Sequence, residues 1–191
     1  MFILKLEVII MAFEKISLET WLKFNTLDYE GTEYLPRTDE LNYKHIAKPE
    51  RSTSKSAGYD FKLPFDIDVP ENQTIVLPSG IKANLDDLVQ PEKSSAIRIE
   101  LNSRVFLALY PRSSLGFNYR FTMPNTIPII DADYYNNNDN EGHILIAFRV
   151  GKRLTLPVGS KFCQGIIQRY FIMEDDNAKG VRTGGIGSTG K

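Results

Sequence analysis

The sequence contains little of what several common chemistries need. Its one cysteine, Cys163, excludes an internal disulfide framework, and one cysteine with two histidines, His45 and His143, cannot form a closed Cys/His zinc site. Lys and Arg number 23 against 24 Asp and Glu, a net charge of -1, so no overall positive field attracts nucleic acid or an anionic membrane. Reactive chemistry must therefore depend on carboxylates, hydroxyls, Arg and backbone groups.

Long hydrophobic runs are also missing. No run approaches the ~20 apolar residues of a membrane span. The apolar opening of the chain contains Glu7 and lacks the hydrophobic core and cleavage site of a signal peptide. We therefore expect a cytoplasmic protein with no membrane partner and no direct nucleic-acid partner. The 191 residues, 42% of them hydrophobic, suffice for one globular domain.

Helical periodicity is confined to one short stretch. Ser17 is expected to cap a helix over residues 18–24, with Leu18, Trp21 and Leu22 on one face, and residues 25–40 are predicted to be a connector. From residue 41 onward, short apolar or alternating runs are separated by Gly and Pro. We expect strands at 61–69 (with an edge or bulge at Pro64), 74–77, 80–85, 97–101, 104–110, 144–150, 153–156 and 161–172. This pattern is typical of an all-β barrel or jelly roll.

Two segments could carry phosphate chemistry. Asp60 follows the small-residue turn Ser56-Ala57-Gly58, although an Asp at a turn is often only a local hydrogen-bond acceptor. Arg112-Ser113-Ser114 follows the most apolar strand directly. A guanidinium and two hydroxyls are suited to phosphate oxygens, while the alternative is a Ser-rich surface turn.

A third segment contains the pair Asp131-Ala132-Asp133. Asp131 follows an apolar pair and is expected at the end of a buried strand with restricted solvation, where a carboxylate can orient and deprotonate water. A metal site and an Asx turn are the two alternatives for this pair, and both stay open. The fourth segment is the tail of residues 182–191, whose glycines, hydroxyls and Arg182 are suited to wrapping an anion. Its alternative is an ordinary disordered terminus.

These segments, in this order and together with residues 159–164, resemble the five motifs of the trimeric dUTP pyrophosphatases (dUTPases). The motifs are matched by residues 57–60, 111–116, 125–134, 159–164 and 182–190, and the likeness covers residues 41–191. It implies an all-β, jelly-roll-like barrel subunit over residues 41–175. Residues 1–40 would then be an N-terminal extension with a short helix, and residues 176–191 a flexible Gly-rich arm.

The resemblance also implies an activity, a cofactor and an assembly. A homotrimer would hydrolyse dUTP to dUMP and pyrophosphate, with Mg²⁺ held mainly by phosphates and waters. Asp131 would hold the water that attacks the α-phosphorus, and Asp60 would contact the water shell of the metal. Tyr134 would pack under the deoxyribose and leave no space for a 2′-hydroxyl. Asn125 and Ile130 would belong to the hairpin whose backbone reads uracil.

The remaining roles concern the phosphates and the arm. Phosphate binding would fall to Arg112, Ser113, Ser114, Lys161, Gln164 and Arg182, and the arm would cover the substrate with Gly184, Gly185, Ile186, Gly187 and Ser188. Three residues depart from the family pattern: Lys161 replaces an Arg, Ile186 a Phe, and Pro128 a Gly. The Asn-rich insertion of residues 135–140 replaces a tight turn.

Two alternatives remain from the sequence. The sister dCTP deaminases share the Arg-Ser-Ser-Leu-Gly segment and use a Glu followed by Gly, which Glu141-Gly142 matches. The second alternative is a binding or regulatory protein on the same fold. The two classes are compatible, because residues 1–40 and the Asn-rich insertion offer surfaces for a protein regulator.

Overall fold

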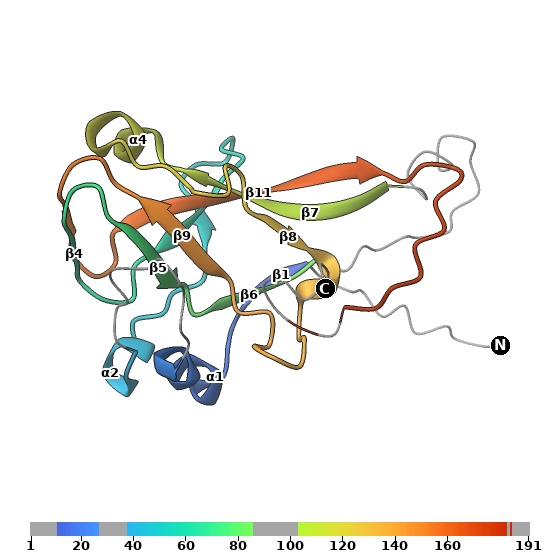
Figure 1. The fold of residues 1–191 in the computed structure, drawn as a ribbon, viewed down its shortest axis with the longest axis horizontal. Coiled ribbons are helices and arrows are strands. Elements are labelled where there is room, and N and C mark those ends of the chain that lie inside the picture. The colour runs from blue at the N-terminus through green and yellow to red at the C-terminus, as the bar shows by residue number, and fades with distance from the viewer. Residues whose placement is uncertain (1–10, 27–37, 86–102, 183, 185–191) are drawn as a thin grey trace.

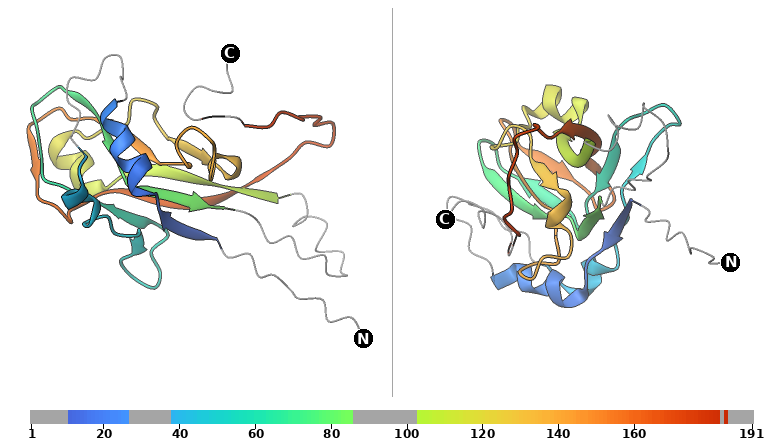
Figure 2. Two further views of the ribbon diagram at one scale, coloured as in Figure 1. Left: turned by 90° about the horizontal axis from the view of Figure 1, so that it is seen from below. Right: turned by 90° about the vertical axis from the view of Figure 1, so that its right-hand side faces the viewer.

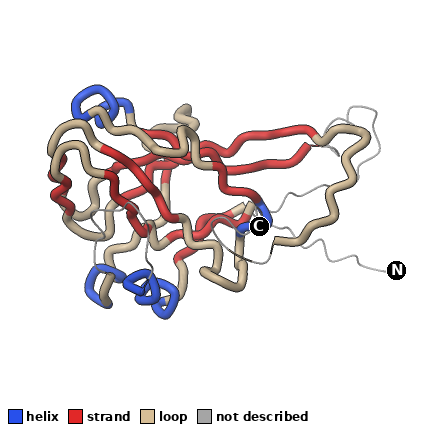
Figure 3. The backbone as a smooth tube through the Cα atoms, viewed as in Figure 1, coloured by secondary structure: helices blue, strands red, loops and turns tan. Residues whose placement is uncertain are grey.

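Strands dominate the computed structural model, which describes residues 11–26, 38–85, 103–182 and 184 (Figures 1 and 3). The elements in chain order are β1 (Ala12–Lys15), α1 (Leu18–Lys23), η1 (Phe24–Thr26), α2 (Glu40–Tyr43), β2 (Glu50–Arg51), β3 (Tyr59–Lys62), β4 (Ile67–Val69), β5 (Thr74–Pro78), β6 (Ile81–Asn84), β7 (Ser103–Pro111), α4 (Ser113–Tyr119), β8 (Ile129–Asp131), η2 (Ala132–Tyr134), β9 (Leu145–Arg149), β10 (Leu154–Leu156) and β11 (Lys161–Phe171).

The largest sheet has the strand order β2-β3-β11-β7-β8, and every pair in it is antiparallel. β7 and β11 are paired from Cys163↔Pro111 to Phe171↔Ser103. β8 pairs with only the middle of β7, and β3 with only the first part of β11. The far ends of β7 and β11 therefore continue as a two-stranded ribbon beyond the rest of the sheet (Figures 1 and 2).

Three further two-stranded sheets, β5-β9, β4-β10 and β1-β6, complete the framework. Along β9 the burial alternates, with Ile146 and Phe148 fully buried, as expected of a strand with one face on the core. The core joins the sheets, and it includes Phe61, Leu107 and Leu109 of the largest sheet and Ile75 and Leu77 of β5. The all-β, jelly-roll-like prediction is confirmed. The described strands form four separate sheets and do not close into a single barrel.

The predicted N-terminal helix is confirmed as α1. Ser17 caps it, and its Oγ accepts a hydrogen bond from the Thr20 backbone N–H at 3.1 Å. Trp21 is completely buried, and its Nε1–H donates to Asp39 O and to Asn42 Oδ1. α1 and α2 therefore pack as one helical pair below the sheets (Figure 1). β1 joins this pair to the framework by pairing with β6.

Several local predictions need correction. The strand expected at 61–69 is two strands, β3 and β4, because Pro64 lacks the N–H that a continuous strand would donate. Two short helices, α2 and α4, were not expected, since four and seven residues are too few for a recognisable helical period. The strand predicted at 97–101 lies outside the described residues.

The chain doubles back after β11. From the end of the ribbon, residues 172–182 return to the turn η2, which carries Tyr134 (Figure 1). The helices among the described residues are all too short to cross a bilayer. The exposed apolar residues Tyr170, Phe171 and Met173 mark the point where the chain leaves β11.

Candidate active site

A polar pocket of about 300 Å³ lies where β3, β7 and β11 meet. Its lining residues are Ser52, Ser56, Gly58, Asp60, Arg112, Ser113, Ser114 and Gln164. Five of them were predicted to bind phosphates or the metal's water shell, and they come from three separate segments of the sequence. The sheet register brings them together, because β11 pairs with β3 on one side and with β7 on the other.

Asp60 is the buried charge of this pocket, with 5% of its surface exposed. Its Oδ2 accepts a hydrogen bond from Ser52 Oγ at 2.6 Å and lies 2.9 Å from Lys161 Nζ, and its Oδ1 lies 3.4 Å from Arg112 Nε. Burial alone would raise the pKa of Asp60, but the hydrogen bonds from Ser52 and Lys161 and the charge of Arg112 lower it overall. Asp60 is therefore an ionised carboxylate that holds two cations at the rim of the pocket.

Gln164, the register partner of Asp60, and the start of α4 complete the pocket. Gln164 is fixed by a hydrogen bond from its Nε2 to Pro111 O at 3.2 Å. Ser113 and Ser114 occupy the first turn of α4, where both are exposed and line the pocket. A Cβ at Gly58 would lie 2.4 Å from Gln164 Oε1, so a side chain here would displace the Gln164 amide.

A second polar cluster surrounds Asp131. Arg182 Nη2 donates to Asp131 Oδ2 at 2.8 Å, and its Nε donates to Asp133 Oδ1 at 2.9 Å. The guanidinium carbon also lies 5.7 Å from the centre of the Tyr134 ring. The Arg182 side chain is 13% exposed in this arrangement. The arm residue expected to bind phosphate thus contacts the carboxylate expected to activate water.

The two clusters are separated along β7. Asp131 is in register with Phe106, five residues before Pro111, which lies at the polar pocket. At about 3.3 Å per residue this is a separation of roughly 16 Å. The described chain alone does not bring Asp131 to the phosphate-type pocket.

The predicted restricted solvation of Asp131 was wrong. β8 is the edge strand of its sheet and pairs on one side only, so Ile129 is 50% exposed and half of the Asp131 side chain is exposed as well. Ile130 in the same strand is half-buried. Asn125 is exposed in the tight turn before β8, where Thr126 adopts a positive φ. Ile130 pairs with Leu107, and Leu109 N donates to Pro128 O at 3.0 Å, so the chain before β8 runs along β7 toward its Pro111 end.

The arm is described only in part. Gly184 is buried. Gly185, Ile186, Gly187 and Ser188, which were also predicted to contact substrate, lie outside the described residues.

The surroundings of three titratable groups, Cys163, His143 and Glu141, shift their pKa values away from neutral pH. Burial raises the pKa of the Cys163 thiol to about 12, and burial lowers the pKa of His143 to about 3 against the opposing charge of Glu141. Glu141, the expected deaminase base, accepts hydrogen bonds from Ser17 Oγ at 2.6 Å and Ser17 N at 3.0 Å. Burial favours its neutral form, but these bonds, one from Thr20 and the charge of Lys82 lower its pKa to about 2.

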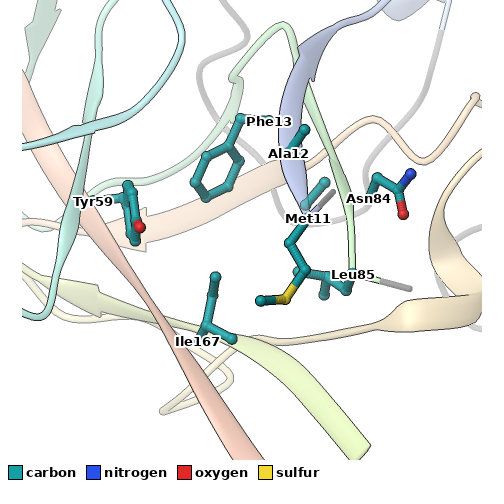
Figure 4. Close-up of a pocket in the computed structure, with 8 residues that line it drawn as sticks. Met11, Ala12, Phe13, Tyr59, Asn84, Leu85 and Ile167 are labelled. Carbon is teal, nitrogen blue, oxygen red and sulfur yellow. The ribbon is translucent and has the colours of Figure 1, made fainter. Parts of the chain in front are cut away.

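A second pocket, of about 140 Å³, lies between β1, β3, β6 and β11. Its described lining residues are uncharged: Met11, Ala12, Phe13, Tyr59, Ala83, Asn84, Leu85 and Ile167 (Figure 4). None of the predicted site residues lines it. Among these two pockets, predicted phosphate-binding residues line only the polar one.

Ser52 and Ser56 both line the polar pocket, although neither was predicted to be a site residue. Ser52 also accepts a hydrogen bond from Lys161 Nζ at 2.6 Å, so it bridges the lysine to Asp60. The available signal was the run of hydroxyl residues just before Asp60. β2 pairs with β3 through Glu50↔Asp60, which brings this run next to the carboxylate.

The fold and these two clusters define a jelly-roll-like protein with a pocket lined by one arginine, hydroxyls, an amide and a buried carboxylate. The dUTPase family model matches residues 44–190, and the chain belongs to the dUTPase family. It is 31% identical over 146 residues to the deoxyuridine 5′-triphosphate nucleotidohydrolase of Lactococcus lactis, covering 74% of this chain and 87% of the relative. It is 26% identical to that of Pseudomonas fluorescens over 151 residues, covering 74% and 86%.

Solved structures agree on the fold. The dUTPase of Streptococcus mutans is 25% identical with a TM-score of 0.53, and the match covers 69% of this chain and 91% of that one. A mutant dUTPase from phage phi11 of S. aureus, described with a structural Mg(II) ion, is 13% identical with a TM-score of 0.52 and matches 74% and 95% of the two chains. At this identity the phage protein supports the fold alone.

Proposed function

We propose that this chain hydrolyses dUTP to dUMP and pyrophosphate, which would keep uracil out of DNA and supply dUMP. The observation that carries the proposal is the polar pocket itself. Asp60, Arg112, Ser113, Ser114 and Gln164 converge there on a fold of the dUTPase family. Donors fixed before substrate arrives stabilise the charge that develops during phosphoryl transfer.

Arg112, Lys161 and the two serines would bind the phosphate chain. Arg112 can bind two phosphate oxygens at once, whereas Lys161 acts as a point charge. Ser113 and Ser114 supply hydroxyl donors, and Gln164 an amide. The contact of Lys161 with Asp60 and Ser52 supports a fixed position for its ammonium group. Arg182 would join them at the terminal phosphates once it leaves Asp131.

The donors present fit Mg²⁺ that is held largely by the substrate. No group of three His, Cys, Asp or Glu side chains suited to a metal occurs among the described residues. The polar pocket contributes one carboxylate, Asp60, and its oxygens already face Ser52, Lys161 and Arg112. Mg²⁺ often keeps several waters and binds through few carboxylates plus substrate phosphates. Asp60 would therefore contact water on the ion, which neutralises charge on the phosphate oxygens.

Asp131 would act as the general base. It would take a proton from the water whose oxygen attacks the α-phosphorus, the bond from that phosphorus to the α–β bridging oxygen would break, and pyrophosphate would leave. The separation of roughly 16 Å from the polar pocket within one chain supports an assembly in which a second copy supplies Asp131. We propose the homotrimer of the family, whose copies would share each site.

The same side of the chain would select the nucleoside. Tyr134 would pack under the deoxyribose, and the backbone of the hairpin from Asn125 to Ile130 would read the uracil edge. The arm of residues 176–191 would close over the substrate with Arg182, Gly184, Gly185, Ile186, Gly187 and Ser188. In this division residues 1–40 are an extension of the catalytic domain at 41–175.

The deaminase alternative is disfavoured by the surroundings of Glu141. A base that moves protons between water and the cytosine ring needs a carboxylate that reaches substrate and takes up a proton near neutral pH. Glu141 is instead hydrogen-bonded to Ser17 and paired with Lys82 at 3.4 Å, and its pKa is about 2. A regulatory role for the chain's outer surface stays a prediction from the sequence.

A nucleotide panel tests the proposed function. Purified protein is given dUTP, dTTP, dCTP and UTP in turn, with Mg²⁺ and with a chelator, and released pyrophosphate is measured. We expect rapid release from dUTP only, and only with Mg²⁺. Equal rates for all four nucleotides would overturn the proposal. Ammonia release from dCTP would instead identify a deaminase.

A further inference from the structure

The N-terminal extension contacts the loop that follows Tyr134. Ser17, the cap of α1, donates from its Oγ and its backbone N to Glu141 Oε2 at 2.6 and 3.0 Å. Lys82 Nζ lies 3.4 Å from Glu141 Oε1 and donates to Asn136 Oδ1 at 2.6 Å. On the same side, Tyr135 OH donates to Glu14 Oε2 at 2.8 Å. The loop of residues 135–143 is thus tied at Tyr135, Asn136 and Glu141 to β1, to β6 and to the cap of α1.

The loop needs such support because its backbone is strained. Asn136 and Glu141 have φ values of 53° and 57°, in the left-handed region that residues with a Cβ rarely adopt. Gly142 follows with a φ of 78°, and a Cβ there would lie 2.6 Å from Tyr134 O. The loop therefore folds tightly back onto Tyr134, and the bonds to the Glu141 carboxylate hold that geometry.

The same loop fixes the hydroxyl of Tyr134. Tyr134 OH donates to His143 O at 3.0 Å and accepts a hydrogen bond from Asn140 Nδ2 at 2.8 Å. These two partners flank Glu141 and Gly142 in the sequence. Tyr134 is 7% exposed, and both of these hydroxyl partners belong to residues 140–143. Its orientation thus depends on where residues 140–143 lie.

α1 of the N-terminal extension also contacts the same loop, at His143 and Asp139. His143 is completely enclosed, its Nε2 accepts a hydrogen bond from Gly80 N at 3.0 Å, and its ring centre lies 6.1 Å from that of Trp21. Lys23 Nζ of α1 donates to Asp139 O at 3.0 Å. The contacts run without interruption from α1 through residues 139–143 to the Tyr134 hydroxyl.

We propose that Ser17 and Glu141 are positioning residues that fix Tyr134 for the choice between deoxyribose and ribose. This inference depends on the proposed function, in which Tyr134 packs under the sugar. Without the Ser17–Glu141 bonds the loop relaxes, Tyr134 gains freedom, and the space that excludes a 2′-hydroxyl opens. The extension thereby determines sugar specificity without touching substrate.

The experiment measures kcat/KM for dUTP and for UTP in the full chain and compares their ratio among variants. We expect Ser17→Ala and Glu141→Gln each to lower the ratio about tenfold, the value typical of a lost hydrogen bond to a charged group. The lower ratio should result from a higher kcat/KM for UTP, with kcat/KM for dUTP little changed. Ser17→Thr keeps both the hydroxyl and a good helix cap and should restore the wild-type ratio.

Thr155→Ala is the matched control. Thr155 Oγ1 donates to Asp68 Oδ1 at 2.9 Å, a hydroxyl-to-carboxylate bond on β10 and β4 with no contact to Tyr134. The ratio should not change in this variant. Trp21 is the only tryptophan in the chain and is buried, so its emission reports whether α1 stays in place.

The outcomes separate this inference from the proposed function. A wild-type chain without preference for dUTP overturns both. A wild-type chain with that preference, whose ratio is unchanged in Ser17→Ala and in Glu141→Gln, overturns the positioning role alone. An equal fall of the ratio in Thr155→Ala also overturns it, because the effect would then follow general destabilisation.

Discussion

Arg182 and Asp131 form a hydrogen-bonded ion pair, with Nη2 and Oδ2 2.8 Å apart, between the returning arm and the end of β8. The pair joins two residues with separate tasks in the proposed reaction, since Asp131 would take a proton from water and Arg182 would bind phosphate. Both tasks require the pair to open. In the proposed reaction, substrate binding would therefore be coupled to rearrangement of the arm.

Asp131→Asn should lower turnover by about a hundredfold or more, the typical contribution of a general base, with little change in dUTP binding. Asp133→Asn is the matched control, because Asp133 also accepts a hydrogen bond from Arg182, at 2.9 Å, but has no assigned role as base. Single-turnover rates and binding measurements would separate the two variants. Equal losses of turnover would remove Asp131 from the role of base.

Deletion of residues 182–191 should abolish activity and leave the proposed trimer intact. The deletion removes Arg182 and the glycine-rich segment expected to enclose the phosphates, and loss of such charge stabilisation costs a hundredfold or more. Pyrophosphate release measures activity, and light scattering measures the mass of the assembly. A truncated chain with normal turnover would contradict the assignment of the arm.

Gly58→Ala should raise the KM for dUTP about tenfold, as expected when one phosphate ligand is displaced. The added methyl would lie 2.4 Å from Gln164 Oε1 and 3.2 Å from Gln164 Cβ, so the Gln164 amide must turn away from its present position. Gly180→Ala is the control, because a Cβ there meets no atom within 4 Å. Steady-state kinetics test both, and an unchanged KM in Gly58→Ala would show that Gln164 does not bind substrate.

The folded chain should lose stability as the pH falls from 7 to 5. Burial lowers the pKa of His143 to about 3, whereas the unfolded value is 6.5. The unfolded state then binds more protons below pH 6.5, and the loss reaches about 2 kcal/mol at pH 5. Urea unfolding at a fixed protein concentration measures it.

His143→Gln provides the comparison for this pH effect, because glutamine does not titrate. The window from pH 5 to 7 also lies above the unfolded pKa of Glu141, 4.5, so that residue contributes little there. We expect a smaller loss in the variant. Identical pH dependence of the two proteins would show that His143 is not responsible.

The predictable part of the fold was the part governed by local pattern. The apolar run at 104–110 and the Ser17 cap gave β7 and α1 correctly, because burial on both faces and capping leave direct marks in the sequence. α4 was not predicted, because Gly116 and aromatic residues weaken its helical pattern. The exposure of β8 was not predicted, because it follows from the position of β8 at the edge of the sheet, and the local sequence does not determine the strand order.

The candidate site shows the same division. The motif residues at the polar pocket were found from the sequence, and the register of β3, β11 and β7 explains their convergence. Ser52 was missed because its position next to Asp60 follows from the pairing of β2 with β3. The contact of Arg182 with Asp131 within the same chain was also not predicted, because nothing in the sequence determines where the returning arm meets the sheet.

The length of β11 has a geometric consequence. Gln164 at the polar pocket and Phe171 at the end of the strand are seven residues apart, or roughly 23 Å along an extended chain. Each arm therefore starts far from the pocket of its own chain. An insertion or deletion of two residues in both strands of the ribbon would move that starting point by about 7 Å while the pocket stays as it is. In the proposed homotrimer, such a change would alter how far the arm reaches toward the pocket of a neighbouring copy.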